Sequence, residues 1–252
     1  MNSVDAAVRA LLGARETGRP AIAADVPLVD AEAAYAVQEG VAAALGGFSD
    51  GGPAHWKSGG ASRESVQTHA LLPSRGVHAS PADGTTLPLV MRGIEAEVAL
   101  RIGRDVDAVT ADGLDLDTAR ALVDAMCVSI ELVESRWVEG LDAPPLAKLA
   151  DMQSHGGLVL GGWVPFTTCD WSQQVCRVTL GDRPTVERRG SHAMADPAFV
   201  LSAWLRHATR TGAWVRQGTV VTTGTWCGVL HAAGGDLVIA EFPGIGRASI
   251  QL

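Results

Sequence analysis

The sequence predicts a β-rich α+β fold in which a helical segment precedes a domain of mostly non-alternating strands. Apolar residues at helical spacing occupy about the first 45 positions, whereas short apolar stretches bounded by glycine and proline follow from about residue 54. The chain has 252 residues, of which 47% are hydrophobic and 19% are charged, which is enough for one buried core. We therefore divide it into an N-terminal helical segment, residues 1–50, and a larger mixed-β domain, residues 51–252.

Two helices are expected in the N-terminal segment. The first presents one apolar face and ends at the Gly-Arg-Pro sequence of residues 18–20; the face is formed by Val4, Val8, Leu11 and Leu12. The second runs from about residue 30 to residue 45, with Asp30 as its N-cap and Gly46 and Gly47 closing it. These helices would form an accessory layer or an oligomer contact.

The larger domain is expected to consist mainly of strands. Their apolar stretches lie near residues 54–59, 93–104, 127–134, 157–165, 173–181, 218–225, 236–242 and 246–252. Two helices interrupt them, near residues 115–126 and 196–211, and Asp196-Pro197 is a favourable start for the second. Loops rich in glycine and proline occupy residues 46–62, 73–93 and 138–147. This order differs from the strand–helix alternation of a βαβ protein.

Charge and composition exclude several classes of partner. The net charge of -8 argues against a nucleic-acid partner, because binding to phosphates requires clustered cations. The N-terminus has no signal-peptide pattern, and the longest apolar run, near residues 156–166, is too short and too rich in glycine to span a bilayer. The four cysteines have spacings that fit no zinc site and indicate reduced thiols. We therefore expect a cytoplasmic protein that contacts neither nucleic acid nor membrane.

Two acids at strand spacing mark the first candidate site. In the apolar stretch 93–102, Glu95 and Glu97 fall on the same face, because side chains of a strand alternate between its two faces. Two carboxylates side by side repel each other unless a cation lies between them. Oxygen ligands favour Mg²⁺, Mn²⁺ or Ca²⁺. A solvated strand face is the alternative, and it is the stronger reading for an isolated Glu-x-Glu pair.

A third acid lies in the middle of a second apolar strand. Val128, Ile130 and Leu132 share one face of this strand, and Glu131 falls on the other. A buried carboxylate needs a partner, because a lone buried charge is costly. Metal ligation would supply that partner, and a salt bridge to an arginine such as Arg101 or Arg136 would supply it equally well.

Three further segments carry polar groups near glycine turns. Lys57 lies in a short strand that enters a glycine loop, where a lysine beside a metal can act as an acid, a base or an electrostatic clamp. A polar loop over residues 151–157 contains His155, and loops of this kind often contact substrates. The stretch 218–225 ends in Gly224-Thr225, whose N–H and hydroxyl groups could bind a carboxylate.

Taken together, eight segments of the chain resemble the 2-keto-4-pentenoate hydratase branch of the fumarylacetoacetate hydrolase superfamily in sequence, order and spacing. Their order and spacing extend over nearly the whole chain: residues 34–38 (AYAVQ), 56–57 (WK), 93–97 (GIEAE), 130–137 (IELVESRW), 149–151 (LAD), 157–161 (GLVLG), 223–225 (TGT) and 242–246 (FPGIG). The set in this order is specific, although no single segment is.

The resemblance implies both a fold and an activity. The fold would be a mixed β-roll core of the fumarylacetoacetate hydrolase C-terminal-domain type, in a homo-oligomer. One Mg²⁺ or Mn²⁺ ion would be held by Glu95, Glu97 and Glu131, with Lys57 beside it. The chain would be a metal-dependent lyase that adds water to a 2-hydroxy-2,4-dienoate through a metal-stabilised enolate.

The remaining candidate residues follow from the same resemblance. Ser154 and Thr225 would join Lys57 as catalytic residues, and the substrate would be bound by Asp151, His155, Gly224 and Arg75. Arg75 lies where the branch usually has an acidic loop; here residues 71–76 read LLPSRG and contain no aspartate. Residues 55–59 (HWKSG) and 150–152 (ADM) also depart from the usual GWKIG and ADN patterns. These departures leave the exact substrate open, and Arg75 would suit a substrate with a second carboxylate.

Three alternatives compete with the hydratase. The same enolate would serve a decarboxylase of a 4-oxalocrotonate-like 2-keto diacid. An acylpyruvate C–C hydrolase would need a base to activate water, and only His155 or Glu134 is available for that role. A non-catalytic subunit that keeps the metal for structure and associates with a related pathway enzyme is the fourth possibility.

Overall fold

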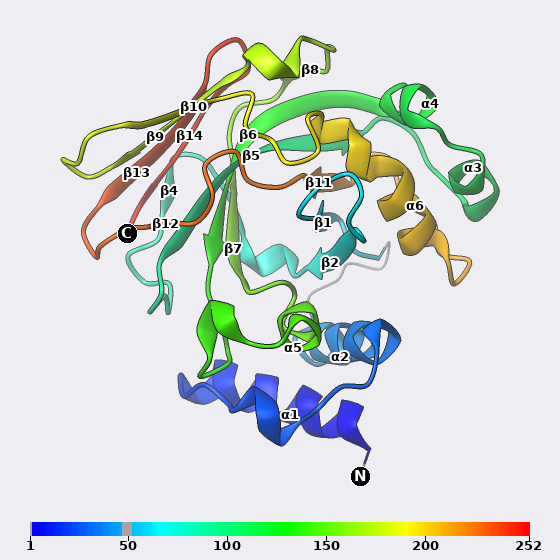
Figure 1. Ribbon diagram of the computed structural model, residues 1–252, viewed down its shortest axis with the longest axis vertical. Coiled ribbons are helices and arrows are strands. Elements are labelled where there is room, and N and C mark those ends of the chain that lie inside the picture. The colour runs from blue at the N-terminus through cyan, green and yellow to red at the C-terminus, as the bar shows by residue number, and fades with distance from the viewer. Residues whose placement is uncertain (1, 47–51) are drawn as a thin grey trace.

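The computed structural model describes residues 2–46 and 52–252 and is centred on a large curled sheet (Figure 1). This sheet has nine strands, seven of which follow the order β2-β1-β11-β5-β6-β7-β3, while β12 pairs with β5 and β8 with β6. Their bounds are β1 (His55–Gly59), β2 (Thr68–Leu72), β3 (Val77–Ala79), β5 (Gly93–Ile102), β6 (Val123–Val133), β7 (His155–Leu160), β8 (Val164–Pro165), β11 (Val220–Thr222) and β12 (Leu230–His231). The pairs β1–β11 and β3–β7 are parallel, so the sheet is mixed.

A second sheet packs against the first. Its order is β10-β9-β13-β14-β4, with bounds β4 (Ala82–Asp83), β9 (Val175–Leu180), β10 (Val186–Arg189), β13 (Leu237–Phe242) and β14 (Gly246–Gln251). Along β9 every second side chain is buried, namely Cys176, Val178 and Leu180, which is the period of a strand with one solvent face. Strands β13 and β14 contact β6, so the core lies between the two sheets.

Two groups of helices flank the sheets. At the lower end of Figure 1 lie α1 (Ser3–Thr17), α2 (Ala31–Ala44) and α5 (Pro145–Ala150). On the right of the same view lie α3 (Ala108–Asp112), α4 (Leu116–Arg120) and α6 (Leu201–Thr209). Asp30 caps α2 by accepting a hydrogen bond from the N–H of Ala33, and Gly18 ends α1 with a left-handed φ of 68°. Both predicted N-terminal helices are therefore confirmed.

The fold class is confirmed, and one predicted helix is wrong. The helix expected over residues 115–126 ends at Arg120, and β6 begins at Val123. Strand β6 extends this far because it pairs with β5 as far as Ile102, a long-range pairing that local sequence spacing does not report. Short elements in regions expected to be loops were also missed; these are β3, β4 and the first half of α5, while β2, β10, β12 and α3 lie in stretches that were given no element.

The predicted division of the chain was not tested. Its boundary between residues 50 and 51 and the closing role of Gly47 lie in segment 47–51, outside the described residues. The division into a helical segment and a metal-binding mixed-β domain stays a prediction. Within residues 2–46 and 52–252, no helix has the length and apolar character that crossing a membrane requires.

Candidate metal centre

The three predicted acids converge on one face of the large sheet. Strands β5 and β6 are antiparallel neighbours, and their register sets Glu95 directly opposite Glu131. Glu97 lies two residues farther along β5 and so points the same way as Glu95. One oxygen from each carboxylate lies within 4.8 Å of the other two. Like charges directly opposed on neighbouring strands destabilise a sheet, so this cluster calls for a compensating cation.

Burial makes the repulsion among these acids stronger. Glu131 is fully buried, Glu97 is 2% exposed, and Glu95 is half-buried. Burial and the nearby Glu131 carboxylate raise the pKa of Glu95 to about 8 and that of Glu97 to about 7. Without further positive charge, the cluster therefore holds protons that ordinary carboxylates would have lost at neutral pH.

Glu131 is the acid with two side-chain nitrogen donors, the cationic Lys57 and the imidazole of His155. Its Oε1 accepts hydrogen bonds from Lys57 Nζ at 2.5 Å and from His155 Nδ1 at 3.1 Å. Burial alone would raise the pKa of Glu131, but Lys57 and His155 outweigh burial and lower it. Its other oxygen, Oε2, is buried and has no hydrogen-bond partner among the described residues.

The arginine partners proposed for Glu131 are both wrong. Arg101 instead forms an exposed ion pair with Asp124, at 2.9 Å. Arg136 forms a buried ion pair with Asp151, at 2.6 Å. Glu131 pairs with Lys57 instead because β1 and β11 lie beside β5 in the sheet, which brings Lys57 to this face.

Glu97 is held in place by the end of β11. Its Oε2 accepts a hydrogen bond from the N–H of Gly224 at 3.0 Å and another from the hydroxyl of Thr222. Thr222 Oγ1 also lies 2.9 Å from Ser129 Oγ on β6. Gly224 has a φ of 105°, a conformation that favours glycine and that turns its N–H toward the carboxylate. Thr222 was not predicted, because a threonine inside a strand carries no distinctive sequence signal.

A hard divalent cation fits this arrangement. The three acids supply only oxygen ligands, which suit Mg²⁺ or Ca²⁺ rather than Zn²⁺. The unpartnered Oε2 of Glu131 supplies a buried oxygen that has no other contact among the described residues. The raised pKa values of Glu95 and Glu97 indicate that positive charge is in deficit. The residues that would hold the ion are therefore Glu95, Glu97 and Glu131.

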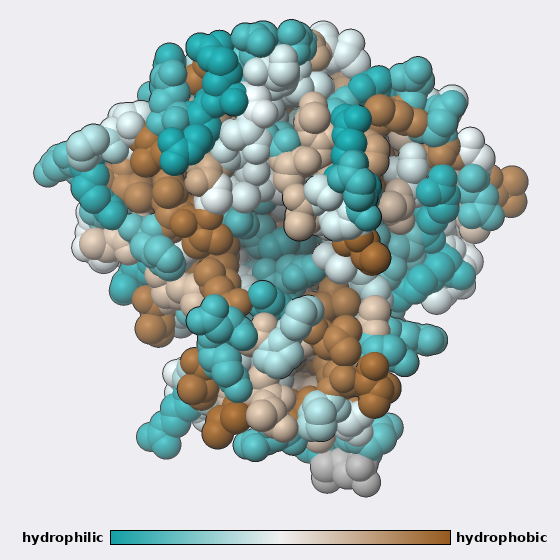
Figure 2. Space-filling model, in the orientation of Figure 1, coloured by the Kyte–Doolittle hydropathy of each residue, from teal (hydrophilic) through white to brown (hydrophobic). Residues whose placement is uncertain are grey.

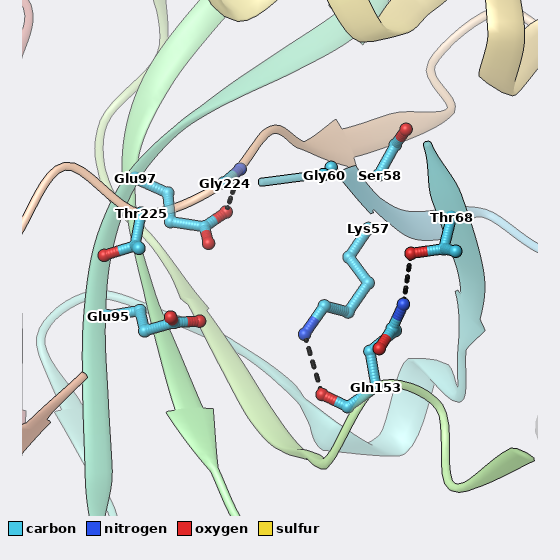
Figure 3. A pocket seen from close by; sticks show the side chains of 10 residues that line it. Lys57, Ser58, Gly60, Thr68, Glu95, Glu97, Gln153, Gly224 and Thr225 are labelled. Atoms are coloured by element: carbon cyan, nitrogen blue, oxygen red, sulfur yellow. Dashed lines mark hydrogen bonds between the residues drawn. The ribbon is translucent and has the colours of Figure 1, made fainter. Parts of the chain in front are cut away.

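Lys57 faces the acids across a pocket. Its Nζ donates to Glu131 and, at 3.1 Å, to the main-chain oxygen of Gln153 (Figure 3). Burial lowers the pKa of Lys57, but the three carboxylates outweigh burial and raise it. Lys57 is therefore a protonated amine whose hydrogen bonds aim it at the acidic cluster.

Glu95, Glu97 and Lys57 line a pocket of about 290 Å³, which we call the metal pocket, and Glu131 lies behind its lining. Figure 2 shows a hydrophilic hollow in the middle of the visible face, between the sheet and the N-terminal helices. The other lining residues are Ser58, Gly59, Gly60, Thr68, Gln153, Gly224 and Thr225. Figure 3 shows Glu95 and Glu97 on one side of this space and Lys57 and Gln153 on the other. Its lining combines glycines with a few charged and polar side chains, an arrangement that suits a small charged ligand.

Gln153 is a lining residue that the sequence did not reveal. It lies in a run of three left-handed residues, Met152, Gln153 and Ser154, with φ values of 51°, 56° and 58°. Such conformations are strained for residues other than glycine and cluster at functional sites. The turn presents the carbonyl of Gln153 to Lys57, and the Gln153 side chain donates to Thr68 Oγ1. The polar loop 151–157 was recognised, but the direction of each side chain depends on these three φ angles.

Five predicted residues do not line the metal pocket; these are Arg75, Glu131, Asp151, Ser154 and His155. Ser154 is buried, and its Oγ has no hydrogen-bond partner among the described residues. Asp151 is fully buried and binds Arg136 and Arg15. Glu131 and His155 form the wall between this pocket and a second cavity, which Arg75 also lines. By contrast, Gly224 and Thr225 line the metal pocket beside the acids.

Comparison with known sequences yields one family and several relatives. Residues 64–252 match the family described as fumarylacetoacetate (FAA) hydrolase C-terminal. A 2-keto-4-pentenoate hydratase of Burkholderia vietnamiensis is 31% identical over 170 residues, which are 65% of this chain and 63% of that protein. The TodF product hydratase of Pseudomonas putida is 28% identical over 158 residues, 62% of this chain and 57% of that protein. The chain thus spans about three fifths of the length of these curated relatives.

Solved structures show the same fold over almost the whole chain. The 4-oxalocrotonate decarboxylase from Pseudomonas putida G7, complexed with calcium and acetate, superposes with a TM-score of 0.82, 19% identity and coverage of 98% of this chain and 96% of that one. Its complex with magnesium and adipate superposes with a TM-score of 0.83 and 18% identity, and the match covers 98% of this chain and 96% of that one. A maleylpyruvate hydrolase from Sphingobium sp. SYK-6, in complex with manganese and pyruvate, superposes with a TM-score of 0.58 and 15% identity. The match covers 79% of this chain and 71% of that one.

Proposed function

The chain belongs to the fumarylacetoacetate hydrolase family, and on that premise we propose that it is a divalent-metal-dependent hydratase of a 2-hydroxy-2,4-dienoate. The observation that carries the proposal is the cradle of Glu95, Glu97 and Glu131 opposite Lys57 in one pocket. The relatives named 2-keto-4-pentenoate hydratase support this choice of substrate. We propose Mg²⁺ or Mn²⁺ as the ion.

The reaction would convert the dienol to its keto form and then add water. Ketonisation places a proton on C5 and leaves a C3–C4 double bond conjugated to the C2 carbonyl. Water then adds its hydroxyl to C4 and a proton to C3, which gives a 4-hydroxy-2-keto acid. A bound divalent cation would supply positive charge for the substrate carboxylate and for the negative charge that develops on the C2 oxygen.

The residues of the pocket would divide the remaining work. Lys57, protonated and aimed at the acids, would stabilise the developing negative charge and donate a proton from Nζ. Gly224 and Thr225 line the pocket beside the acids, but the N–H of Gly224 donates to Glu97 and the hydroxyl of Thr225 donates to the carbonyl of Gly228. Both residues would therefore shape the site rather than bind the substrate carboxylate. Gln153 donates to Thr68 along the Lys57 side of the pocket, and this pair would limit how far the substrate tail extends.

Four of the predicted site residues receive less support from the geometry. Asp151 is committed to two arginines, and Arg75 lines the other cavity, so we assign neither to the dienoate. Ser154 and His155 would act through the wall of the pocket, since His155 binds Glu131 and Ser154 directly precedes it in the chain. We treat both as positioning residues.

A decarboxylase is the second candidate. The superposition on 4-oxalocrotonate decarboxylase over 98% of the chain favours it, although identities of 18–19% establish the fold only. A C–C hydrolase would require His155 or Glu134 as the base. Glu134 accepts hydrogen bonds from the N–H groups of Val90 and Met91, and neither Glu134 nor His155 lines the metal pocket. The C–C hydrolase and the non-catalytic subunit therefore rank below the two lyases, and the homo-oligomer and the cytoplasmic location remain predictions.

One experiment separates the two lyases. The purified protein is incubated with Mg²⁺ and freshly generated 2-hydroxypenta-2,4-dienoate, and separately with 4-oxalocrotonate, while dienol absorbance and CO₂ are followed. We expect loss of the dienol without CO₂. Release of CO₂ from the second acid would replace the hydratase with the decarboxylase. No turnover of either acid, by protein that binds Mg²⁺ in calorimetry, would contradict both and favour the non-catalytic subunit.

A further inference from the structure

A second cavity of about 870 Å³ lies on the other side of the Glu131–His155 wall. The C-terminal end of α1, the segment 73–76, the loop 87–91 and the segment 134–140 enclose it. Much of its surface is apolar, contributed by Leu45, Leu87, Leu89, Met91, Trp137 and Met152. A cavity of this size and character accommodates a small organic molecule.

Three arginines give this cavity an excess of positive charge. Arg15 and Arg136 both bind the same oxygen of Asp151, at 3.3 and 2.6 Å, so one buried carboxylate serves two guanidinium groups. Arg75 is exposed at the rim and makes no ion pair within the described part of the chain. Glu134 is the acid that lines the cavity, and Asp151 lies behind the lining. Three cations therefore face two carboxylates, which leaves one positive charge uncompensated.

The surroundings of Arg15 show the same imbalance. Burial and the neighbouring Arg136 lower the pKa of Arg15 to about 10, even though Asp151 opposes the shift. The Nε of Arg15 is buried and has no hydrogen-bond partner among the described residues. An anion beside Arg15 would therefore satisfy a donor and relieve the repulsion between guanidinium groups.

His155 supplies a hydrogen-bond acceptor in the wall of the cavity. Its side chain is 4% exposed, and its Nε2 is buried without a partner among the described residues. A Cβ added to Gly76, another lining residue, would lie 4.0 Å from this Nε2, so the atom faces the cavity. Because Nδ1 donates to the Glu131 carboxylate, the neutral ring presents the lone pair of Nε2. That lone pair calls for a hydroxyl group on the ligand.

We propose that the second cavity is a binding site for an apolar hydroxycarboxylic acid, separate from the metal pocket. The carboxylate would bind Arg75 and Arg15, the apolar body would lie against the leucine and methionine side chains, and the hydroxyl would donate to His155 Nε2. The two polar ends of this ligand would meet Arg15 Nε and His155 Nε2, which have no hydrogen-bond partner among the described residues. The site lies outside the metal cradle, so its occupation does not depend on the proposed hydratase activity.

Calorimetry with 8-hydroxyoctanoate on protein treated with EDTA tests this proposal. Removal of metal prevents the acid from binding in the metal pocket through a chelated ion. We expect saturable binding, at one site per chain, that Arg75→Glu weakens at least about tenfold, since hydrogen bonds to charged groups are among the strongest. Arg75 is exposed, so the variant keeps its fold. Arg104→Glu, the same change at an exposed arginine outside the cavity, should leave binding unchanged.

Two related probes test the other contacts. Octanoate, which lacks the hydroxyl, should bind about fivefold more weakly, and 1,8-octanediol, which lacks the carboxylate, at least about tenfold more weakly. No binding of 8-hydroxyoctanoate at millimolar concentration would overturn the proposal, as would binding that Arg75→Glu leaves unchanged. Equal affinity of octanoate and 8-hydroxyoctanoate would overturn the role of His155. Absence of binding that persists after dilution to monomer would also overturn the proposal, because a second copy of the chain could then not be filling the cavity.

Discussion

The metal pocket and the second cavity share a wall but carry opposite charge. In the metal pocket, Glu95 and Glu97, with Glu131 behind them, face a single lysine; in the second cavity, three arginines face Glu134, with Asp151 behind the lining. Adjacent residues of the strained turn serve different sides, since Gln153 lines the metal pocket and Met152 the second cavity. The charge of each cavity therefore depends on which strands and loops bring charged side chains to it.

The largest effect should come from breaking the acidic cradle. Replacing Glu97 with glutamine removes a ligand charge but keeps the size of the side chain. We expect turnover to fall at least about 10³-fold, because the charge stabilisation a metal supplies is worth several kcal/mol. Progress curves with Mg²⁺ measure the loss of turnover, and calorimetry with Mg²⁺ measures the loss of metal binding. Glu241→Gln, at an exposed acid on β13, is the matched control; wild-type turnover in Glu97→Gln would rule out the cradle as the site.

Removing the one lysine of the metal pocket should have the next largest effect. Lys57→Met keeps the apolar stem and removes the charge that compensates Glu131. We expect turnover to fall by about 10²- to 10⁴-fold, the range of a lost proton donor. Metal-free protein should also lose about 3–5 kcal/mol of unfolding free energy, because a buried carboxylate loses its partner. Urea titration in EDTA measures the second loss. If stability falls but turnover does not, Lys57 is structural only.

Adding metal should change stability without changing any residue. Mg²⁺ at about 100 times its Kd should stabilise the fold by about 2.7 kcal/mol. For a chain of this length that free energy corresponds to a rise in Tm of about 5–10 °C. Thermal unfolding with Mg²⁺ and with EDTA gives the difference. Glu97→Gln should reduce the rise, while Arg75→Ala should keep it; an equal rise in both variants would place the ion elsewhere.

The smallest effect should come from the cationic side of the wall. Arg75→Ala should leave kcat/KM for the dienoate within about twofold, since exposed charges outside a site contribute little. The ratio of activity toward monoacids and diacids should also stay constant, because Arg75 lines the second cavity. Steady-state kinetics with both substrate types measures this ratio. A fall in activity toward diacids alone would restore Arg75 to the substrate site, as the sequence suggested.

Much of the candidate site followed from local spacing. The alternation of a strand puts Glu95 and Glu97 on one face, and this holds in β5. The N-cap of α2 at Asp30 also follows from neighbouring residues alone. Features of this kind depend on a few consecutive residues, whose geometry is fixed by covalent structure and local hydrogen bonds. They could be read from the sequence for that reason.

Other features depend on distant segments and were missed or misassigned. The partner of Glu131 was expected to be an arginine, but the placement of β1 beside β11 makes it Lys57. The helix expected over 115–126 gave way to β6, because pairing with β5 outweighs local helix preference. Gln153 reaches the metal pocket only because three consecutive residues adopt left-handed angles.

The sequence by itself determined the fold class, the two capped N-terminal helices, and the pair of acids that share a strand face. Only the tertiary structure decided that Glu131 stands opposite Glu95, that Lys57 compensates it, and that Arg75 lies beyond the wall. The physical reason is the sequence separation of the residues that determine each feature. Alternation along a strand is a property of adjacent residues, whereas strand register and the sharing of buried charge are settled by the free energy of the whole packed sheet.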